Sequence, residues 1–386
     1  MYIIFYARRS IDLNWTFVYK NFTTGGLETF VLRVGRYITY KGGNSTIVCF
    51  SISEKIKEQL TRAGVIIKKI DDWNIQNITG AIFSKCDITL TFGLSTYYSL
   101  KNMNIEGRII LYCVHPYHLT MEDRKNNLLN MIKKPIFSSI IKKGIQRKEI
   151  LFMDHPAANQ VAKQYNFYIP EENIILLPFE KANKYKKWAD SRDVTKILSI
   201  CRADFPFKAY VIGLIKAVKS MLDNHVPLEL TVISYGENIE EVRAIIGKNA
   251  KIHLVGETEY KDLEKYYLEA DIYVGMGTTS IEAAKYGIPN ICAKAYSYEF
   301  LSCGLFCDNP EANGMYSEKC TSGIEELTQL ISMNNQELKT VGEKCRIIFE
   351  KNYGMEQFCQ KFMSIQPRQE LSNYKIYTIL KHFIYL

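Results

Sequence analysis

Residues 274–291, VGMGTTSIEAAKYGIPNI, combine glycines, hydroxyl side chains and one carboxylate in a predicted strand, loop, helix and second strand. Gly275 and Gly277 carry no Cβ, so a ligand can approach the backbone closely. Three hydroxyl residues stand where the helix should begin, namely Thr278, Thr279 and Ser280. The first amides of a helix are unpaired and its dipole favours an anion. The segment therefore predicts a binding site for a phosphate group.

Glu282 lies in the first turn of that predicted helix. Its carboxylate can accept hydrogen bonds from two vicinal hydroxyls, which is what binding a nucleotide ribose requires. The spacing Thr279-x-x-Glu282 is also that of a capping box, in which the two side chains satisfy amides at a helix start. Both interpretations stay open on this segment alone, and they do not exclude each other.

Two cations follow another candidate strand, KILSIC at 196–201. Arg202 comes directly after this strand, and Lys208 opens a predicted helix six residues later. Ligands of open α/β sheets bind at the carboxyl ends of strands, so both cations should face the same site as Gly277 and Glu282. A guanidinium and an ammonium complement a departing diphosphate without a metal. The alternative is that both are solvated surface charges.

The first half of the chain offers two further candidates. Gly25 and Gly26 precede the helical segment LETFVLRVGRYI, at the end of a loop expected from Arg8 to Thr24. A glycine pair at a helix start suits close approach of a ligand, and is also an ordinary flexible entry to a helix. His115 ends the strand RIILYCV, and a histidine at the carboxyl end of a strand is an active-site candidate.

The elements that must position these residues alternate between strand and helix, which is typical of parallel sheets covered by helices on both faces. In the first half we expect helices at 26–40, 53–63, 122–133 and 156–166 and strands at 2–6, 45–50, 88–92, 108–114 and 149–153. A Lys- and Asn-rich stretch at 180–193 reads as a linker. In the second half we expect strands at 196–201, 228–234, 251–255, 271–275 and 289–293. The pattern predicts two doubly wound domains in series.

Length and composition agree with two globular domains. The chain has 386 residues, 47% hydrophobic and 23% charged, and no apolar run long enough to span a bilayer. Arg8 and Arg9 follow the apolar YIIFYA, whereas a signal peptide has its basic residues in front, so we expect a cytoplasmic protein. The net charge of +8 favours acidic partners such as the phosphates of nucleotides or lipids.

The ten cysteines include no CxxC pair and read as reduced core residues. Cys303 and Cys307 have the spacing of one helical face, but without further ligands nearby this is weak for a metal, and packing is the better interpretation.

Residues 133–148 carry six basic side chains and no acidic one, mixed with isoleucines and Phe137. This mixture suits either the surface of an anionic membrane or an ordinary solvated helix beside the core.

Together these parts resemble glycosyltransferase family 4, whose members have the GT-B fold. The motifs that carry the resemblance are GGLETF at 25–30, LYCVH at 111–115, ILSICRADFPFK at 197–208, VGETEYKDLEKYYLEADIYV at 255–274 and GMGTTSIEAAKYGIP at 275–289. The resemblance implies an α/β fold of two doubly wound Rossmann-like domains facing across a cleft. We expect an N-terminal acceptor-side domain at 1–185, a nucleotide-sugar-binding domain at 186–365, and a helix at 366–386 that packs back on the first domain.

By this resemblance Arg202 and Lys208 bind the diphosphate of a nucleotide-sugar, and Glu282 binds its ribose. The amides from Gly277 to Thr279 hold the phosphate or the sugar. The remaining implied donor contacts are Gly25 and Gly26 near the phosphate, His115 against the donor sugar, and Gly256 and Glu257 near the base.

The sequence departs from the family at one important position. The family has two acidic residues separated by seven others, and the position eight before Glu282 is Val274. The carboxylate that contacts the donor sugar in the family is absent, which leaves the identity of the sugar open. Cys201 also stands where the family usually has glycine.

The resemblance implies a retaining glycosyltransferase that moves a hexosyl or N-acetylhexosaminyl group, with a UDP-sugar favoured as donor. The acceptor would be a glycan or lipid-linked glycan in the synthesis of a bacterial surface polysaccharide. The resemblance implies that the reaction uses no metal or cofactor, and we expect no nucleic acid partner. The alternatives are a non-catalytic partner subunit, a nucleotide-sugar epimerase or a sugar phosphorylase of the same fold.

Overall fold

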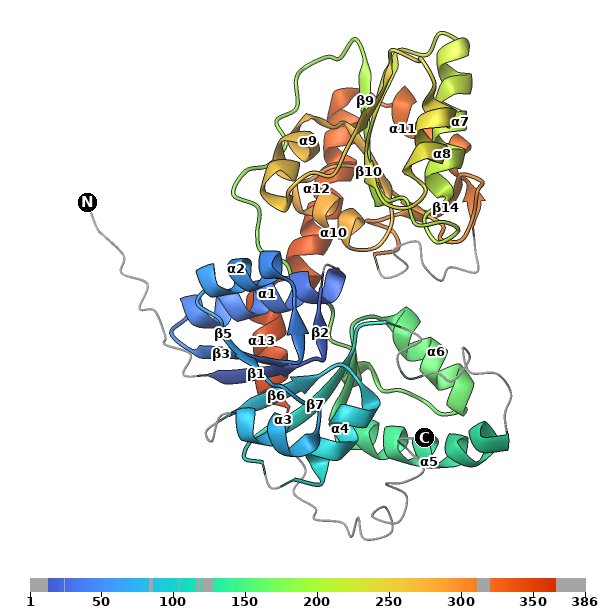
Figure 1. The fold of residues 1–386 in the computed structure, drawn as a ribbon. Coiled ribbons are helices and arrows are strands. Elements are labelled where there is room, and N and C mark those ends of the chain that lie inside the picture. Colours follow the sequence, from blue (N-terminus) through green and yellow to red (C-terminus); the bar gives the residue numbers. More distant parts are fainter. Residues whose placement is uncertain are drawn as a thin grey trace, which may run out of the picture. The chain divides into compact units, whose positions relative to one another are not determined.

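The structure, a computed structural model, describes residues 13–23, 25–82, 86–103, 105–115, 119, 128–310 and 320–365, without the side chains of 128–134. The chain divides into two units, the first formed by Met1–Phe179 with Met355–Leu386 and the second by Glu180–Gly354 (Figure 1). The sequence predicts divisions at 185 and 365. The strand expected at 2–6 and the helix expected at 366–386 lie outside the described residues.

The first unit contains a parallel sheet with the strand order β5-β3-β1-β6-β7-β8. Its strands are β1 (Asn14–Val18), β3 (Asn44–Cys49), β5 (Ile66–Lys69), β6 (Ile88–Thr91), β7 (Arg108–Cys113) and β8 (Ile150–Phe152). The short strands β2 (Asn21–Phe22) and β4 (Ser51–Ile52) pair separately. The loop predicted from Arg8 to Thr24 is therefore wrong, because β1 lies inside it and pairs on both sides.

Alternate residues of these strands enter two different cores, as the two-residue repeat of a strand requires. Trp15 and Phe17 pack on one face with α1 (Gly26–Tyr40), α2 (Glu54–Arg62) and α13 (Met355–Ser364). Val18 and Val48 belong to the core on the other face. The helices of that second face are α3 (Ile75–Ala81), α4 (Leu94–Lys101), α5 (Leu128–Gln146) and α6 (His155–Tyr165), and the 3-10 turn η1 (Glu171–Asn173) follows them. Two-sided burial explains why these strands are apolar almost throughout.

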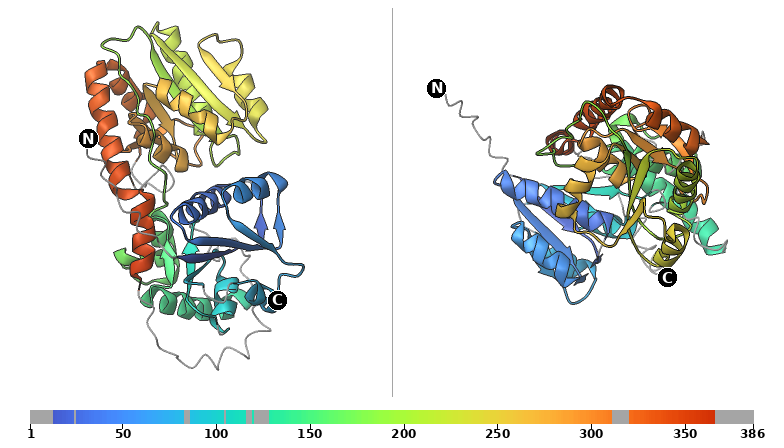
Figure 2. Two further views of the ribbon diagram at one scale, coloured as in Figure 1. Left: turned by 90° about the vertical axis from the view of Figure 1, so that its left-hand side faces the viewer. Right: turned by 90° about the horizontal axis from the view of Figure 1, so that it is seen from above.

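Helix α13 belongs to the first unit although it follows the whole of the second in the sequence (Figures 1 and 2). Phe358 and Phe362 lie with ring centroids 5.4–6.4 Å from those of Trp15 and Tyr112. The Arg108 guanidinium donates to the carbonyls of residues 362, 363 and 365 at 2.8–3.0 Å. A cation on the last carbonyls of a helix satisfies unpaired acceptors and complements the dipole. Aromatic burial and this cap together attach the end of the described chain to the first unit.

The second unit contains a sheet with the strand order β11-β10-β9-β12-β13-β14-β15. The first five strands in this order pair in parallel, and β14 pairs antiparallel with β13 on one side and with β15 on the other. They are β9 (Thr195–Arg202), β10 (Leu228–Tyr235), β11 (Ile252–Val255), β12 (Ile272–Gly275), β13 (Asn290–Ala293), β14 (Leu301–Leu305) and β15 (Thr321–Ser322). The parallel part brings the carboxyl ends of β9 and β12 together as neighbours.

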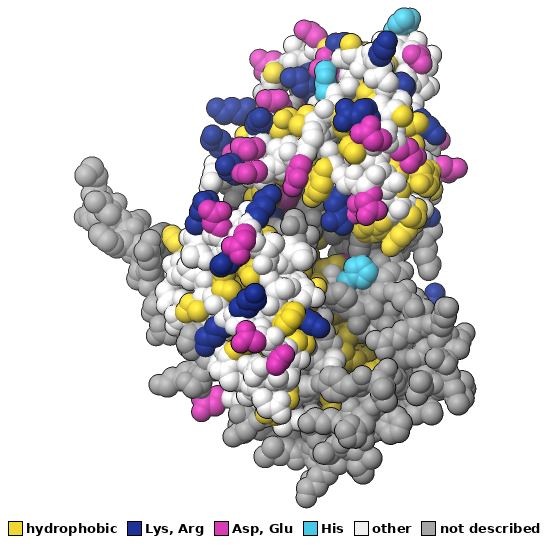
Figure 3. Space-filling model, in the orientation of Figure 1, with side chains coloured by type: hydrophobic (Ala, Val, Ile, Leu, Met, Phe, Trp, Pro, Cys, Tyr) yellow, Lys and Arg dark blue, Asp and Glu magenta, His cyan; other side chains and the backbone are white. Residues whose placement is uncertain are grey.

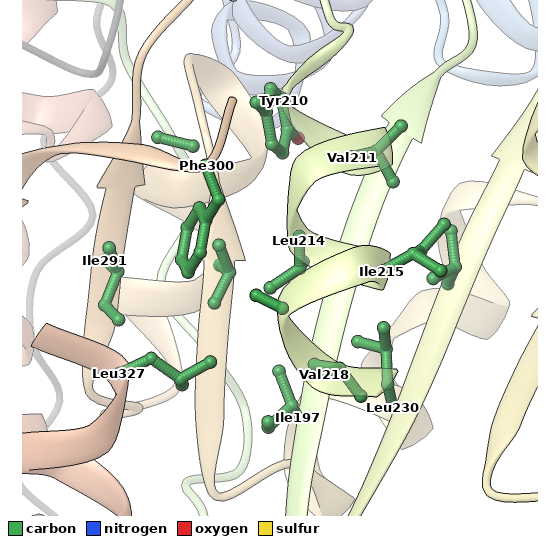
Figure 4. Close-up of a cluster of buried hydrophobic side chains, with 14 of the residues drawn as sticks. Ile197, Tyr210, Val211, Leu214, Ile215, Val218, Leu230, Ile291, Phe300 and Leu327 are labelled. Carbon is green, nitrogen blue, oxygen red and sulfur yellow. The ribbon is translucent and has the colours of Figure 1, made fainter. Parts of the chain in front are cut away.

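Helices cover both faces of this sheet, as expected from the sequence. One core lies under α7 (Tyr210–Asp223), α8 (Ile239–Ile246) and α11 (Gly323–Ser332), and Figure 4 shows the aliphatic side chains of α7 directed at the strands. The other core lies under α9 (Leu263–Glu269) and α10 (Thr278–Lys285). The 3-10 turn η2 (Tyr260–Asp262) precedes α9, and α12 (Asn335–Asn352) packs on α10.

One glycine allows α12 to lie against the turn that follows α10. A Cβ at Gly342 would stand 2.1 Å from the carbonyl oxygen of Gly287. Since such a contact is impossible, any larger residue at 342 would move α12 away from the helix that carries Glu282.

Two sequence expectations change with the fold. Cys303 lies in β14 and Cys307 in the turn after it, so the two do not share a helical face. In the basic stretch 133–148, Ile140, Ile141 and Ile145 are buried in the core, which leaves Lys142 and Lys143 exposed. The apolar half of that stretch is thus occupied by the protein itself. No helix in the described part of the chain is long and apolar enough to cross a membrane.

Candidate functional site

The turn between β12 and α10 consists of Met276 and Gly277 only. Gly277 is the N-cap of α10 and has φ 64° and ψ −140°, a backbone conformation that L side chains rarely adopt. A Cβ built at Gly277 meets nothing within 4 Å, so the space beside it is open. At Gly275 a Cβ would lie 2.4 Å from the Tyr273 hydroxyl oxygen. At Gly277 the absence of a side chain therefore leaves space for a ligand. At Gly275 it leaves space for the side chain of Tyr273.

The amides at the start of α10 are not capped by a side chain. Thr279 lies at the second helical position, and its hydroxyl donates to the carbonyls of Met276 at 3.0 Å and Ile200 at 3.3 Å. The capping box predicted from Thr279 and Glu282 is therefore wrong. The backbone amides of Thr278 and Thr279 have no protein acceptor within the described ranges, so they remain available to an anion.

The bond from Thr279 to Ile200 joins the start of α10 to the end of β9, where Arg202 is the last strand residue. The Arg202 side chain is 48% exposed and its Nε donates to the Asp204 carboxylate. Lys208 lies in the turn just before α7, where its backbone amide donates to the Asp204 carbonyl at 3.1 Å. The carboxyl end of β9 thus presents both predicted cations beside the uncapped helix start.

The surroundings of Lys208 disfavour its charged ammonium unless an anion is bound beside it. Burial is the largest effect and holds the pKa of Lys208 below its ordinary value. The Arg202 cation lowers this pKa further, whereas Cys201 and Asp204 raise it. A desolvated lysine next to an arginine gains more from a bound polyanion than an exposed lysine does.

Glu282 is buried, and both of its carboxylate oxygens have partners. One carboxylate oxygen accepts from the Tyr260 hydroxyl at 2.6 Å, and the other pairs with the Lys285 ammonium at 2.6 Å. The Lys285 ammonium is also 4.8 Å from the ring centroid of Tyr286 and 5.7 Å from that of Tyr260. The side chains of Lys285 and Glu282 are 6% and 5% exposed. Since Tyr260 is 47% exposed and bonded to this carboxylate, it forms the outer part of the cluster.

Sequence reasoning missed Tyr260 and Lys285. The signal for Lys285 was available, because an acid and a base three residues apart on a helix are neighbours. Tyr260 had no local signal, since η2 and α10 meet only in the folded unit.

Gly256 and Glu257 lie in an exposed loop that leaves β11 and leads into η2. The Thr258 hydroxyl donates to the Gly256 carbonyl at 3.1 Å and shapes this loop. The loop therefore ends at Tyr260, beside Glu282.

The position eight residues before Glu282 lies away from the uncapped start of α10. Val274 is fully buried in β12, pairs with Ile291, and packs in the core under α7. Because β12 continues to Gly275 and the turn after it has only two residues, position 274 belongs to the strand. A glutamate at 274 would be desolvated in an apolar core.

The first unit places its predicted residues at the ends of separate elements. Gly25 is the N-cap of α1 and Gly26 is its first residue, with open space where a Cβ would stand. Glu28, which sequence reasoning did not single out, is buried and accepts from the Thr23 amide at 3.0 Å. His115 follows β7, and its carbonyl accepts from the Cys113 thiol at 3.1 Å.

Acidic and basic side chains are interspersed over the exposed surface of the second unit, as the space-filling view shows (Figure 3). Among the residues that the structure describes, no group of three His, Cys, Asp or Glu side chains is arranged to hold a metal ion.

Comparison with known families gives a match for residues 183–303, which fit the sequence profile of group 1 glycosyl transferases. This range contains Arg202, Lys208, Gly277 and Glu282. A search of curated proteins by sequence gave no significant match.

Several solved structures share the fold across most of the chain. A glycosyltransferase from Rickettsia africae superposes with a TM-score of 0.64 at 16% identity, covering 91% of this chain and 97% of that one. A point variant of S. aureus TarM, solved with fondaparinux, α-GlcNAc-glycerol and UDP, gives a TM-score of 0.62 at 12% identity, with 92% and 99% covered. The lipopolysaccharide outer core galactosyltransferase WaaB gives 0.60 at 14% identity, with 92% and 100% covered. The fold expected from the sequence, GT-B, is confirmed.

Proposed function

We propose that this chain, a glycosyltransferase of the GT-B fold, is a retaining enzyme that takes its sugar from a nucleotide-sugar, with a UDP-sugar favoured. One observation carries the proposal. Arg202, Lys208 and the uncapped start of α10 converge at the carboxyl ends of two neighbouring strands, tied by the bond from Thr279 to Ile200. Two cations and free helix amides in one place fit a diphosphate.

The chemistry follows from charge. Departure of a nucleoside diphosphate builds negative charge on the oxygen that leaves the sugar. Donors fixed before the reaction stabilise that charge as it forms. In the proposed enzyme Lys208 and Arg202 supply this stabilisation, so the leaving group requires no metal and no protonation.

The second half of the donor would lie at the cluster around Glu282. One carboxylate oxygen accepts from the Tyr260 hydroxyl and the other pairs with the Lys285 ammonium, and a carboxylate can accept from two vicinal hydroxyls. The Lys285 ammonium supports the ionised carboxylate, which accepts hydrogen bonds only. The ribose would bind there after the Tyr260 hydroxyl moves aside, and the loop at Gly256 and Glu257 would approach the base.

Two structural neighbours support the choice of donor and acceptor class. TarM was solved with UDP and α-GlcNAc-glycerol, and WaaB is a galactosyltransferase of the lipopolysaccharide outer core. A UDP-hexose or UDP-N-acetylhexosamine donor and a surface-glycan acceptor are therefore the first substrates to try. In the first unit Gly25, Gly26 and His115 are the residues proposed to meet the acceptor side and the donor sugar.

Retention of configuration is proposed to occur by front-face attack, in which the departing phosphate helps to take the proton of the acceptor hydroxyl. The enzyme is proposed to work in the cytoplasm. Contact with an anionic membrane would depend on exposed lysines such as Lys142 and Lys143, since the isoleucines beside them are buried.

The test is a panel of nucleotide-sugars and nucleoside diphosphates, read by thermal shift and by slow hydrolysis of the donor. A bound ligand raises the apparent melting temperature by mass action. We expect one base and one sugar to give both signals, and neither in Lys208→Ala. Absence of a shift with every nucleotide would contradict the proposal.

One observation favours a second candidate, a non-catalytic partner subunit. Glu282 is nearly inaccessible and is neutralised by Lys285, which is what a residue kept only for stability would show. This alternative predicts no nucleotide binding and unchanged function of the assembly in Lys208→Ala.

A further inference from the structure

Two cysteines of the second unit face each other across the antiparallel end of its sheet. Strand β14 pairs with β15 so that Leu301 lies opposite Ser322 and Ser302 opposite Thr321. Continued by one residue, this register places Cys303 opposite Cys320. The two sulfur atoms are 3.9 Å apart.

The exposure of the two thiols differs. Cys303 is 5% exposed, whereas Cys320 is partly exposed at the end of the described segment 320–365. Cys320 is therefore the cysteine that an oxidant can reach from solvent, and the buried Cys303 sulfur lies 3.9 Å from the Cys320 sulfur. This is the arrangement of a reactive thiol with a resolving partner.

A second thiol pair lies nearby and serves as an internal comparison. Cys307 follows β14, and a hydrogen bond with the Cys345 thiol of α12 is the largest cause that lowers its pKa. Cys345 itself is fully buried within α12. Of the two pairs, only Cys303 and Cys320 adjoin paired strands, with Cys303 in β14 and Cys320 directly before β15, so that the register of β14 and β15 sets them opposite each other.

We propose that Cys303 and Cys320 form an oxidation site, at which an intramolecular disulfide closes between β14 and β15. The proposal is independent of the nucleotide-sugar activity. A disulfide needs its two Cβ atoms about 4 Å apart and its sulfurs at about 2.0 Å, so opposed strand residues require only side-chain rotation. In a reducing compartment the pair stays as thiols, and the bond forms transiently under oxidation.

The chemistry balances with a peroxide as oxidant. The Cys320 thiolate attacks one peroxide oxygen, the O–O bond breaks, and Cys320 becomes a sulfenic acid while the departing hydroxide takes up the proton that the thiol had lost and forms the first water. The Cys303 sulfur then attacks the Cys320 sulfur, the S–O bond breaks, and a second water is released. Two thiols are oxidised, hydrogen peroxide is reduced to two waters, and the chain from 303 to 320 becomes a covalent ring.

The test uses the full-length protein, reduced, desalted, and exposed to hydrogen peroxide before free thiols are blocked with N-ethylmaleimide. Trypsin separates the cysteines well, because peptide 295–319 carries Cys303 and Cys307, peptide 320–339 carries Cys320 alone, and Cys345 falls in 345–346. We expect a bridge between 295–319 and 320–339, about tenfold more abundant than any other bridge and absent after treatment with dithiothreitol.

Matched variants assign the bridge. Cys307→Ser should keep it, and Cys303→Ser should lose it and instead accumulate sulfinic acid or a blocked sulfenic acid at Cys320. Because Cys303 is buried, Cys320→Ser provides a second variant with less risk to folding, and it should also lose the bridge. A dominant bridge to 345–346, or equal oxidation of Cys320 without a bridge in wild type and Cys303→Ser, would overturn the proposal.

Discussion

The two units are built alike, yet their carboxyl edges hold the predicted site residues in different ways. In the second unit the site is already connected, because Thr279 joins α10 to β9, Asp204 joins Arg202 to the turn of Lys208, and Tyr260 joins the β11 loop to Glu282. In the first unit Gly25 and Gly26 lie at the start of α1, whereas His115 lies after β7, at the end of a different element.

The difference indicates where the protein is prepared for its ligand. A connected set of cations and amides keeps its geometry before substrate arrives, and such preorganisation is the main source of electrostatic stabilisation in enzymes. The edge of the first unit offers open backbone at Gly26 and a single imidazole. We therefore expect substitutions in the second unit to act on donor binding and chemistry, and those in the first to act on transfer alone.

The largest effect should come from Glu282→Ala, because it leaves the buried Lys285 ammonium without its partner. Breaking a buried ion pair from one side costs about 3–5 kcal/mol. We expect a large drop in the free energy of unfolding measured in urea. The double variant Glu282→Gln/Lys285→Met should recover most of that stability while nucleotide binding stays weak. Restored binding in the double variant would show that Glu282 serves stability only.

Lys208→Ala should lower transfer about 100- to 1000-fold, the usual effect of removing one preorganised electrostatic donor. Lys216→Ala is the matched control, since that lysine is exposed on α7 and away from the strand end. Rates are measured with saturating acceptor and varied donor. Near-normal turnover in Lys208→Ala would contradict the proposal that the cations at the carboxyl end of β9 stabilise the leaving group.

Tyr260→Phe should raise affinity for the nucleotide up to about tenfold, because the ribose no longer competes with the phenolic hydroxyl for Glu282. Isothermal titration with the nucleoside diphosphate and with its deoxyribose analogue checks this, since only the ribose form should gain. Weaker binding of both forms would assign Tyr260 a direct contact with the nucleotide.

Gly26→Ala tests the first unit. No atom lies within 4 Å of the added Cβ, so the change in unfolding free energy should stay within about 0.5 kcal/mol. Transfer should fall several-fold while nucleotide affinity is unchanged. An equal loss of nucleotide affinity would instead indicate that Gly26 contacts the donor phosphate, as the family resemblance implies.

The smallest effect concerns pH. Burial holds the pKa of Lys208 below that of a free lysine. Between the lowered pKa and the ordinary one, the unfolded chain binds more protons than the folded protein, so stability should rise slightly with pH in that window. Binding of a diphosphate requires the charged ammonium, so nucleotide affinity should fall as pH rises through the same window. In Lys208→Arg this dependence should disappear from both titrations.

Much of the fold could be read from local pattern. Nine of the ten expected strands occur within one residue of their predicted bounds, because strands buried on both faces are apolar throughout and end at polar turns. The tenth lies outside the described residues. The missed strands are short or partly exposed, as IIKK of β5 shows, and β1 was hidden because NWTFV mixes polar and apolar residues.

At the site, the sequence determined which chemical groups are present. The glycines of the turn, the two cations after KILSIC and the glutamate of α10 are set by residue type and by their distance from a strand end. Open α/β topology then fixes that such residues share one edge.

Only the tertiary structure decided how each group is used. In the folded protein the Thr279 hydroxyl donates to the Ile200 carbonyl, Glu282 bonds with Tyr260 and Lys285, and Val274 is buried in the core. Sequence spacing cannot specify these outcomes, because they depend on the length of one turn and on contacts between elements far apart in the chain.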